Sequence, residues 1–160
     1  MKMDVRERLK KLKAKLKKER PNKRIGFLVD GPNMMRKEYD FDLSKIRKQL
    51  EVYGQVKIGK IFLNQYAPEK LIEAIVNQGF EPIVITTDDV DAPMAAEAME
   101  VVFNPHIDIL ALMTRDADFQ SVLLKAKKHG KETLVVGSEP FSAALQNTAD
   151  HVIMIKSFGK

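Results

Sequence analysis

Residues 25–33 read Ile-Gly-Phe-Leu-Val-Asp-Gly-Pro-Asn, an apolar run that ends on a carboxylate followed by a Gly-Pro pair. A run that is apolar on both faces is typical of a central parallel strand covered by helices on each side. A similar run at residues 107–113, Ile-Asp-Ile-Leu-Ala-Leu-Met, also precedes an acidic loop. The two runs therefore predict an α/β protein whose parallel strands deliver acidic residues to one edge of the sheet.

Outward from this segment, aliphatic runs alternate with segments of helical period, and Gly, Pro, Asn or Asp separates them. The alternation predicts a Rossmann-like three-layer α/β/α sandwich with a mostly parallel sheet of five or six strands. Asp42 is expected to cap a helix, and Gly79 and Gly130 to end two helices in the left-handed conformation. We expect strands at about 25–30, 55–64, 80–86, 107–113, 132–137 and 151–155, and helices at about 42–53, 68–78, 92–103, 118–129 and 140–148.

Charge divides the chain into two parts. The 160 residues carry 27 Lys+Arg and 22 Asp+Glu, yet residues 1–24 alone hold 12 basic and 3 acidic side chains. The first part therefore has a net charge of +9, and residues 25–160, with 15 basic and 19 acidic side chains, have a net charge of −4. We expect a basic extension at residues 1–23 and one domain at residues 24–160, with separate roles.

The basic extension carries an apolar stripe. Val5, Leu9, Leu12 and Leu16 are spaced 4, 3 and 4 residues apart in a Lys/Arg-rich stretch, which predicts an amphipathic basic helix. Two heptads are too short to establish a coiled coil. Four interpretations stay open: packing on the domain, pairing with another chain, ordering on a nucleic acid, and a solubilising tail that is partly disordered.

Composition excludes several classes of protein. The chain has no Cys, which excludes a disulfide scaffold, a thiolate zinc site and a cysteine nucleophile. No apolar segment approaches the ~20 residues needed to cross a bilayer, and the basic N-terminal residues precede no apolar core of a secretion signal. We therefore expect a soluble cytoplasmic protein without a membrane partner.

Acidic side chains gather directly after the predicted strands. Asp30 ends the first strand, Asp116 and Asp118 follow the fourth, and Asp91 and Glu97 lie on the helix after the third. If the first and fourth strands are neighbours where the strand order reverses, Asp30, Asp116 and Asp118 converge in one cleft. Carboxylates held together repel one another unless a cation compensates them, and an all-oxygen set favours Mg²⁺ or Mn²⁺ over zinc.

Each carboxylate also has an ordinary structural interpretation. Asp91 and Asp118 are plausible helix N-caps, and Asp30 is suited to organise the Gly-Pro turn that follows it. The three histidines share neither spacing nor motif, and we expect them to be structural. The metal site therefore rests on the joint pattern of the carboxylates.

Three blocks of the chain resemble the NYN-domain proteins of the PIN-like nuclease superfamily, in particular the LabA-like group. They are residues 27–34 (Phe-Leu-Val-Asp-Gly-Pro-Asn-Met), 91–98 (Asp-Ala-Pro-Met-Ala-Ala-Glu-Ala) and 114–119 (Thr-Arg-Asp-Ala-Asp-Phe). They are similar to the family's Asp with Asn three residues later, its Asp-x₅-Asp helix start and its Ser-Gly-Asp-x-Asp-Phe block. The resemblance spans about residues 25–155 and does not include the basic extension.

The resemblance implies metal-dependent hydrolysis of phosphodiester bonds, with Mg²⁺ or Mn²⁺ as the cofactor. Asn33 is expected to orient the phosphate or a metal-bound water. The implied catalytic residues are Asp30, Asn33, Asp91, Glu97, Asp116 and Asp118, and all of these except Asn33 are implied metal ligands.

RNA, single-stranded or structured, is the substrate that the resemblance favours. Whether two chains form a homodimer stays open. Because the acidic site alone repels a polyanion, we expect the basic extension to capture the RNA. The expected substrate-binding residues near the site are Asn33, Arg36, Lys37, Thr114 and Arg115, and those of the extension are Lys10, Lys11, Lys13, Lys15, Lys17 and Lys18.

Two departures from the family pattern keep other functions open. Residues 88–90 read Asp-Asp-Val where the family has Lys-Gly before its second acid, and Glu97 replaces an Asp. A catalytically weak or silent RNA-binding protein is therefore the alternative to a ribonuclease. A receiver-like phosphoacceptor fits less well, because no acidic pair marks the first strand, and residues 31–33 lack the glycines of a dinucleotide-binding turn.

Overall fold

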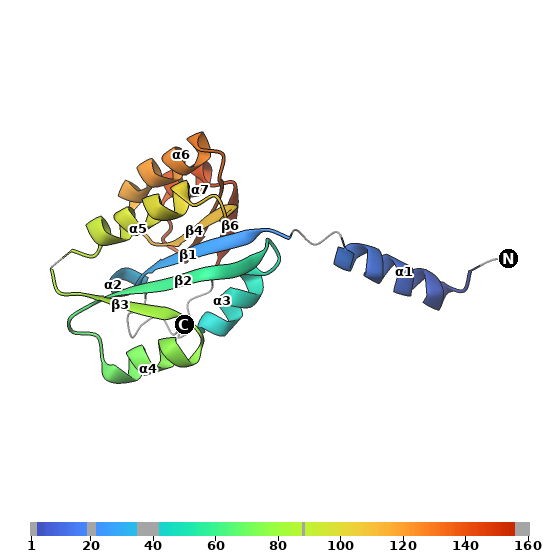
Figure 1. Cartoon of the computed structure of the whole chain (residues 1–160), viewed down its shortest axis with the longest axis horizontal. Coiled ribbons are helices and arrows are strands. Elements are labelled where there is room, and N and C mark those ends of the chain that lie inside the picture. The colour runs from blue at the N-terminus through green and yellow to red at the C-terminus, as the bar shows by residue number, and fades with distance from the viewer. Residues whose placement is uncertain (1–2, 19–21, 35–41, 88, 156–160) are drawn as a thin grey trace.

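A six-stranded parallel sheet forms the centre of the protein (Figure 1) in a computed structural model, which describes residues 3–18, 22–34, 42–87 and 89–155. The strand order is β3-β2-β1-β4-β5-β6, so the order reverses between the neighbours β1 and β4. The strands are β1 (Arg24–Asp30), β2 (Gln55–Asn64), β3 (Glu81–Ile85), β4 (Ile109–Met113), β5 (Glu132–Gly137) and β6 (His151–Met154).

Helices cover both faces of this sheet (Figure 1). One face carries α3 (Leu43–Leu50) and α4 (Glu69–Asn77), and the other carries α5 (Asp91–Phe103), α6 (Gln120–Lys128) and α7 (Ala143–Thr148). The predicted three-layer α/β/α sandwich is confirmed. Three further elements are α1 (Val5–Lys18), the short α2 (Gly31–Met34) and the 3₁₀ turn η1 (Ala117–Phe119).

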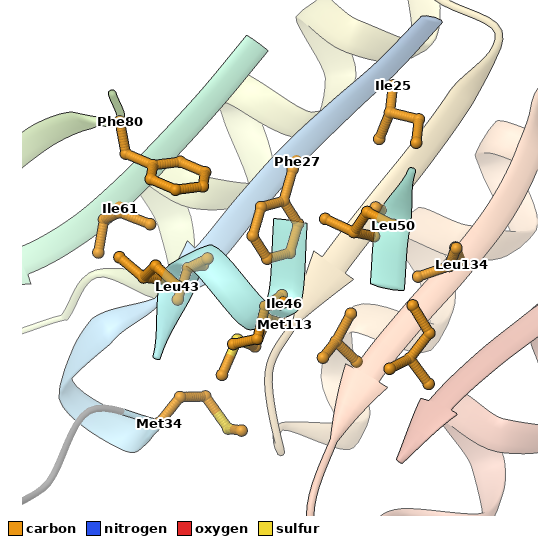
Figure 2. Close-up of a cluster of buried hydrophobic side chains, with 14 of the residues drawn as sticks. Ile25, Phe27, Met34, Leu43, Ile46, Leu50, Ile61, Phe80, Met113 and Leu134 are labelled. Carbon is orange, nitrogen blue, oxygen red and sulfur yellow. The ribbon is translucent and has the colours of Figure 1, made fainter. Parts of the chain in front are cut away.

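Alternate residues of each central strand enter two separate cores. Phe27 of β1 packs under α3 beside Leu43 and Ile46, in the cluster shown in Figure 2. Its neighbour Leu28 faces the other way, into the core beneath α5 and α6. Because side chains alternate along a strand, Asp30 lies on the same face of β1 as Leu28.

The parallel arrangement gives the sheet two chemically different edges. All six strands end at one edge, which we call the carboxyl edge, and all begin at the opposite one, the amino edge. A helix that connects two neighbouring parallel strands runs back, so it begins at the carboxyl edge and ends at the amino edge. The residues after β1, β3 and β4 therefore share the carboxyl edge.

The basic extension forms a helix that stands apart from the three layers (Figure 1). α1 has 14 residues, and the predicted N-terminal helix is confirmed. Val5, Leu9 and Leu12 are 69%, 50% and 54% exposed, so this part of the apolar stripe does not pack on the domain. Within the described residues, no helix has both the length and the apolar character needed to span a membrane.

Several local expectations are met, and two are corrected. Asp42 caps α3 through Ser44 N–H at 2.9 Å, and Gly79 and Gly130 have φ of +84° and +81° after α4 and α6. The residues after Asp30 form the one-turn helix α2, where we expected only a turn. Asp91 is the first residue of α5 and not its N-cap, since that position belongs to Val90.

Candidate active site

The core of the site lies between β1 and β4, where the strand order reverses. Asp30, the last residue of β1, and Thr114, which follows β4, are both fully buried. Thr114 Oγ1 donates a hydrogen bond to Asp30 Oδ2 at 3.2 Å. A buried carboxylate is costly unless it is hydrogen-bonded or compensated by charge. Thr114 therefore fixes the position of Asp30 at the carboxyl edge.

Asp116 joins this pair through the loop after β4. Its backbone N–H donates to Thr114 Oγ1 at 3.1 Å, and its Oδ1 accepts the backbone N–H of Asp118 at 2.9 Å. Asp116 is thus the N-cap of η1, and Phe119 is the N-cap of α6, so Asp118 does not have the N-cap role for which it was suited. The Thr-x-Asp-x-Asp spacing thus forms a hydrogen-bonded loop in which Thr114 contacts both Asp30 and Asp116.

Asp91 brings a third carboxyl group from the start of α5. Burial raises the pKa of Asp91 to about 7, with further contributions from a hydrogen bond with Asp116 and repulsion by Asp116, Asp30 and Asp89. Two carboxyl groups hydrogen-bond each other only when one of them holds a proton. Asp91 is therefore the carboxyl group that keeps a proton up to about pH 7 when no cation is bound beside it.

Glu97 is not brought to this group. It lies six residues after Asp91 on α5, which places it about 9 Å further along the helix axis and about 120° around it. Its Oε2 instead accepts Lys60 Nζ of β2 at 3.0 Å. Lys60 and Glu97 are partly buried. This pair could not be predicted, because a Lys within an aliphatic strand belongs to no motif.

The other predicted residues are placed as follows. The exposed Asp118 follows Asp116 in η1, and its backbone carbonyl accepts Ser121 Oγ at 3.0 Å. Arg115 lies between Thr114 and Asp116 and is half-buried. Predictions that fall outside the described residues concern Arg36, Lys37 and Asp88 as a whole, and the side chains of Asn33, Lys17 and Lys18.

Asp89 was not among the predicted site residues. Its Oδ1 accepts the backbone N–H of Asp91 at 2.8 Å, and its charge contributes to the raised pKa of Asp91. Asp89 therefore fixes the first turn of α5. An Asp two residues before a helical residue forms an Asx turn, and this spacing could have revealed the contact.

The residues fit a hard divalent cation by their chemistry. Among residues 3–18, 22–34, 42–87 and 89–155, no group of three or more acidic or histidine side chains is already arranged to hold a metal ion. Asp30 and Asp116 are nonetheless close enough to Asp91 for their charges to raise its pKa. A bound cation would compensate this repulsion between the carboxylates, as a proton on Asp91 does without it. Mg²⁺ keeps several of its waters, so two or three such carboxylates suffice to bind it.

The Asp91→Asn variant should be more stable than the wild type at pH 8 without divalent metal. Between pH 3.8 and about 7 the folded state keeps a proton that the unfolded state has lost, so the free energy of unfolding falls as pH rises through this window. Asn removes this loss, which we put at about 1–2 kcal/mol after solvent screening. Thermal unfolding from pH 4 to 8 in chelator measures it.

Asp150→Asn is the matched control. Burial acts to raise the pKa of Asp150, but hydrogen bonds from Thr133 and the charge of Lys127 outweigh it and lower the pKa. The Asp150 carboxylate therefore stabilises the folded state above its ordinary pKa, so this variant should lose stability at pH 8. If the stability of Asp91→Asn and of the wild type depended on pH in the same way, the raised pKa of Asp91 would be contradicted.

Comparison with known proteins relates the chain to a domain family. The model of the NYN domain family matches residues 24–156. The chain is 55% identical over 146 residues to the Methanocaldococcus jannaschii protein MJ0482, an alignment that covers 91% of this chain and 60% of that protein. The chain thus spans about three fifths of the length of this relative.

A solved structure shares the fold. It is the crystal structure of VPA0982, a protein of unknown function from Vibrio parahaemolyticus, with a TM-score of 0.73 and 21% sequence identity. The similarity covers 84% of this chain and 93% of the other one. With the match to the family model over nearly the whole globular part, these findings show that the chain belongs to the NYN domain family, which has a PIN-like nuclease fold.

Proposed function

We propose that the protein is a ribonuclease that depends on Mg²⁺ or Mn²⁺ and hydrolyses RNA phosphodiester bonds at the carboxyl edge of the sheet. The observation that carries the proposal is the contact between Asp91 and Asp116 beside the buried Asp30. Acidic side chains from three separate segments meet there at a cost in mutual repulsion. A folded protein keeps such strained groups chiefly at functional sites.

Asp30, Asp91 and Asp116 are the proposed metal ligands. Thr114 holds Asp30 in position, and Asp89 fixes the turn that presents Asp91. A bound divalent ion supplies positive charge to the scissile phosphate and lowers the pKa of a bound water.

The remaining predicted residues would contact metal-bound water or the RNA and would not bind the metal directly. Asp118 is exposed beside Asp116, where it can hydrogen-bond a metal-bound water, and Glu97 is a water-mediated contact at most while Lys60 holds it. Thr114, Arg115 and Asn33 are the proposed phosphate contacts of the domain. The basic extension contributes the affinity for the polyanion.

The direct test is cleavage of RNA by the purified full chain with a divalent ion and with chelator. We expect cleavage with Mn²⁺ or Mg²⁺ and none with chelator, and a melting temperature that rises with the ion because only the folded state binds it. A rise equivalent to about 2.7 kcal/mol corresponds to an ion at 100 times its Kd. The magnitude of the rise at several concentrations gives the affinity of the site.

The same experiment distinguishes the ribonuclease from the alternative, a catalytically silent RNA-binding protein. The Lys60–Glu97 pair favours it, because it occupies a carboxylate that the family resemblance assigns to the metal. RNA binding without cleavage under any of these ions would identify a silent RNA-binding protein. An unchanged melting temperature with both ions would remove the metal site itself.

A further inference from the structure

The last turns of two helices place basic side chains at the amino edge, away from the acidic site. The last turns of α3 and α6 end there, because both helices run back from the carboxyl edge. Cations in the last turn of a helix also offset its dipole, which accounts for part of the pattern. The basic side chains of these two turns are Arg47, Lys48, Lys125, Lys127 and Lys128.

The basic extension joins the domain at this same amino edge. We call this junction, formed by Lys23 and Arg24, the root. Lys23 Nζ lies 2.6 Å from Glu132 Oε1 at the start of β5, and Lys23 O accepts Gln55 N–H at 2.8 Å at the start of β2. The backbone N–H of Arg24 donates to Asp108 Oδ2 at 2.9 Å. These contacts fix the point at which the extension leaves the domain.

The root and the carboxylates lie at opposite ends of one strand. β1 runs from Arg24 to Asp30, and seven residues at ~3.3 Å each separate its two ends by about 20 Å. A stacked nucleic acid strand advances about 3.4 Å per nucleotide, so about six nucleotides are needed to cover this distance. The extension therefore joins the domain about 20 Å from the end of β1 that carries Asp30.

A cavity beside the root does not by itself bind phosphate. It has a volume of about 400 Å³ and is lined by Lys23, Asp108, Lys131 and Glu132 among others. Lys23 is paired with Glu132, and Lys131 Nζ donates to the carbonyls of Asn104 and Ile107. With two carboxylates beside two engaged ammonium groups, the cavity offers no anion site, so the phosphate contacts fall to α1.

We propose that α1 and the amino edge form an RNA-docking surface separate from the carboxyl edge, so that one RNA is held at one end of the sheet and reaches the acidic site at the other. The inference rests on the proposed function. Charge complementarity selects the occupant, because α1 is exposed and its described side chains are dominated by Lys and Arg. The docking surface favours RNA long enough to reach both edges.

The test compares two fourfold variants of α1 in the full chain. One changes Lys10, Lys11, Lys13 and Lys15 to Gln, and its matched control changes the same four lysines to Arg, which keeps the charge. Gln and Arg have helix propensities close to that of Lys, so both variants should keep the helix. Binding is measured in chelator with a labelled RNA of about 30 nucleotides at several salt concentrations.

We expect the Gln variant to bind this RNA at least about tenfold more weakly, with a log–log salt slope smaller by about 3, since each lost phosphate contact on a single strand contributes ~0.7. The Arg variant should match the wild type. The Gln changes and Asp116→Asn should have additive effects on binding within about twofold, because distant sites act independently. Unchanged binding by the Gln variant would overturn the docking surface.

Cleavage of short RNA tests the separation of the two sites. An RNA of about four nucleotides covers roughly 14 Å when stacked and does not reach both edges. The Gln changes should raise the KM for the long RNA about tenfold or more and the KM for this short RNA by a much smaller factor. An equal loss on both RNAs would place α1 beside the carboxylates and overturn the inference. If no RNA is cleaved while binding shifts as expected, the nuclease proposal fails and the docking surface stands.

Discussion

The Asp116→Asn variant should lose RNA cleavage by at least roughly 100-fold, the scale on which removal of one preorganised electrostatic group slows an enzyme. Asp116 is the residue that links the others. Its backbone N–H binds Thr114, its Oδ1 accepts Asp118 N–H, and its carboxyl group meets that of Asp91. Asn keeps the shape and one acceptor oxygen but removes the charge that would bind a cation.

Three measurements separate this loss from unfolding. Single-turnover cleavage with Mn²⁺ should fall to the chelator background, and the melting temperature without metal should not fall, because one repelling carboxylate is gone. The rise in melting temperature on addition of Mn²⁺ should shrink or disappear. A variant that cleaves at the wild-type rate would remove the proposed site.

Asp150→Asn provides the control for this variant. Asp150 is also hydrogen-bonded to a threonine, since its Oδ2 accepts Thr133 N–H at 2.9 Å and Thr133 Oγ1 at 3.0 Å. This pair lies at the amino edge, where β5 and β6 begin. Its loss should lower stability and leave the rate of cleavage unchanged.

The strands and the convergence of the acids could be predicted from sequence because both depend on local pattern. An apolar run of the type at residues 25–29 is stable only between two helical layers, and its carboxyl end fixes where Asp30 lies. The sequence left the neighbouring positions of β1 and β4 as a condition, and the structure meets it. Under this condition the ends of the two strands bring Asp30 and the loop of Asp116 together.

The inner geometry of the site could not be predicted, because it depends on angles and partners that a spacing does not encode. Asp91 and Glu97 form one sequence block, yet the helical period turns them about 120° apart and Glu97 meets Lys60.

Gly31→Ala should destabilise the protein by about 3 kcal/mol, at the upper end of the usual cost of overpacking, and lower the melting temperature by about 6–12 °C. A Cβ on Gly31 would lie 2.3 Å from the backbone oxygen of Phe62 and 2.8 Å from Leu63 Cδ2. Backbone in the central strand β2 cannot yield as a flexible side chain does. The chain after Asp30 must therefore move, and the Asp30–Thr114 hydrogen bond moves with it.

Gly130→Ala separates this steric effect from backbone strain. Gly130 has φ +81° with nothing within 4 Å of an added Cβ, whereas Gly31 does not have a positive φ. Its replacement should cost only about 1 kcal/mol, the strain of an L-residue in the left-handed region, and leave cleavage unaffected. Gly31→Ala should instead reduce cleavage even at temperatures where it stays folded. Full activity of folded Gly31→Ala would show that the catalytic geometry does not depend on the close approach of α2 to β2.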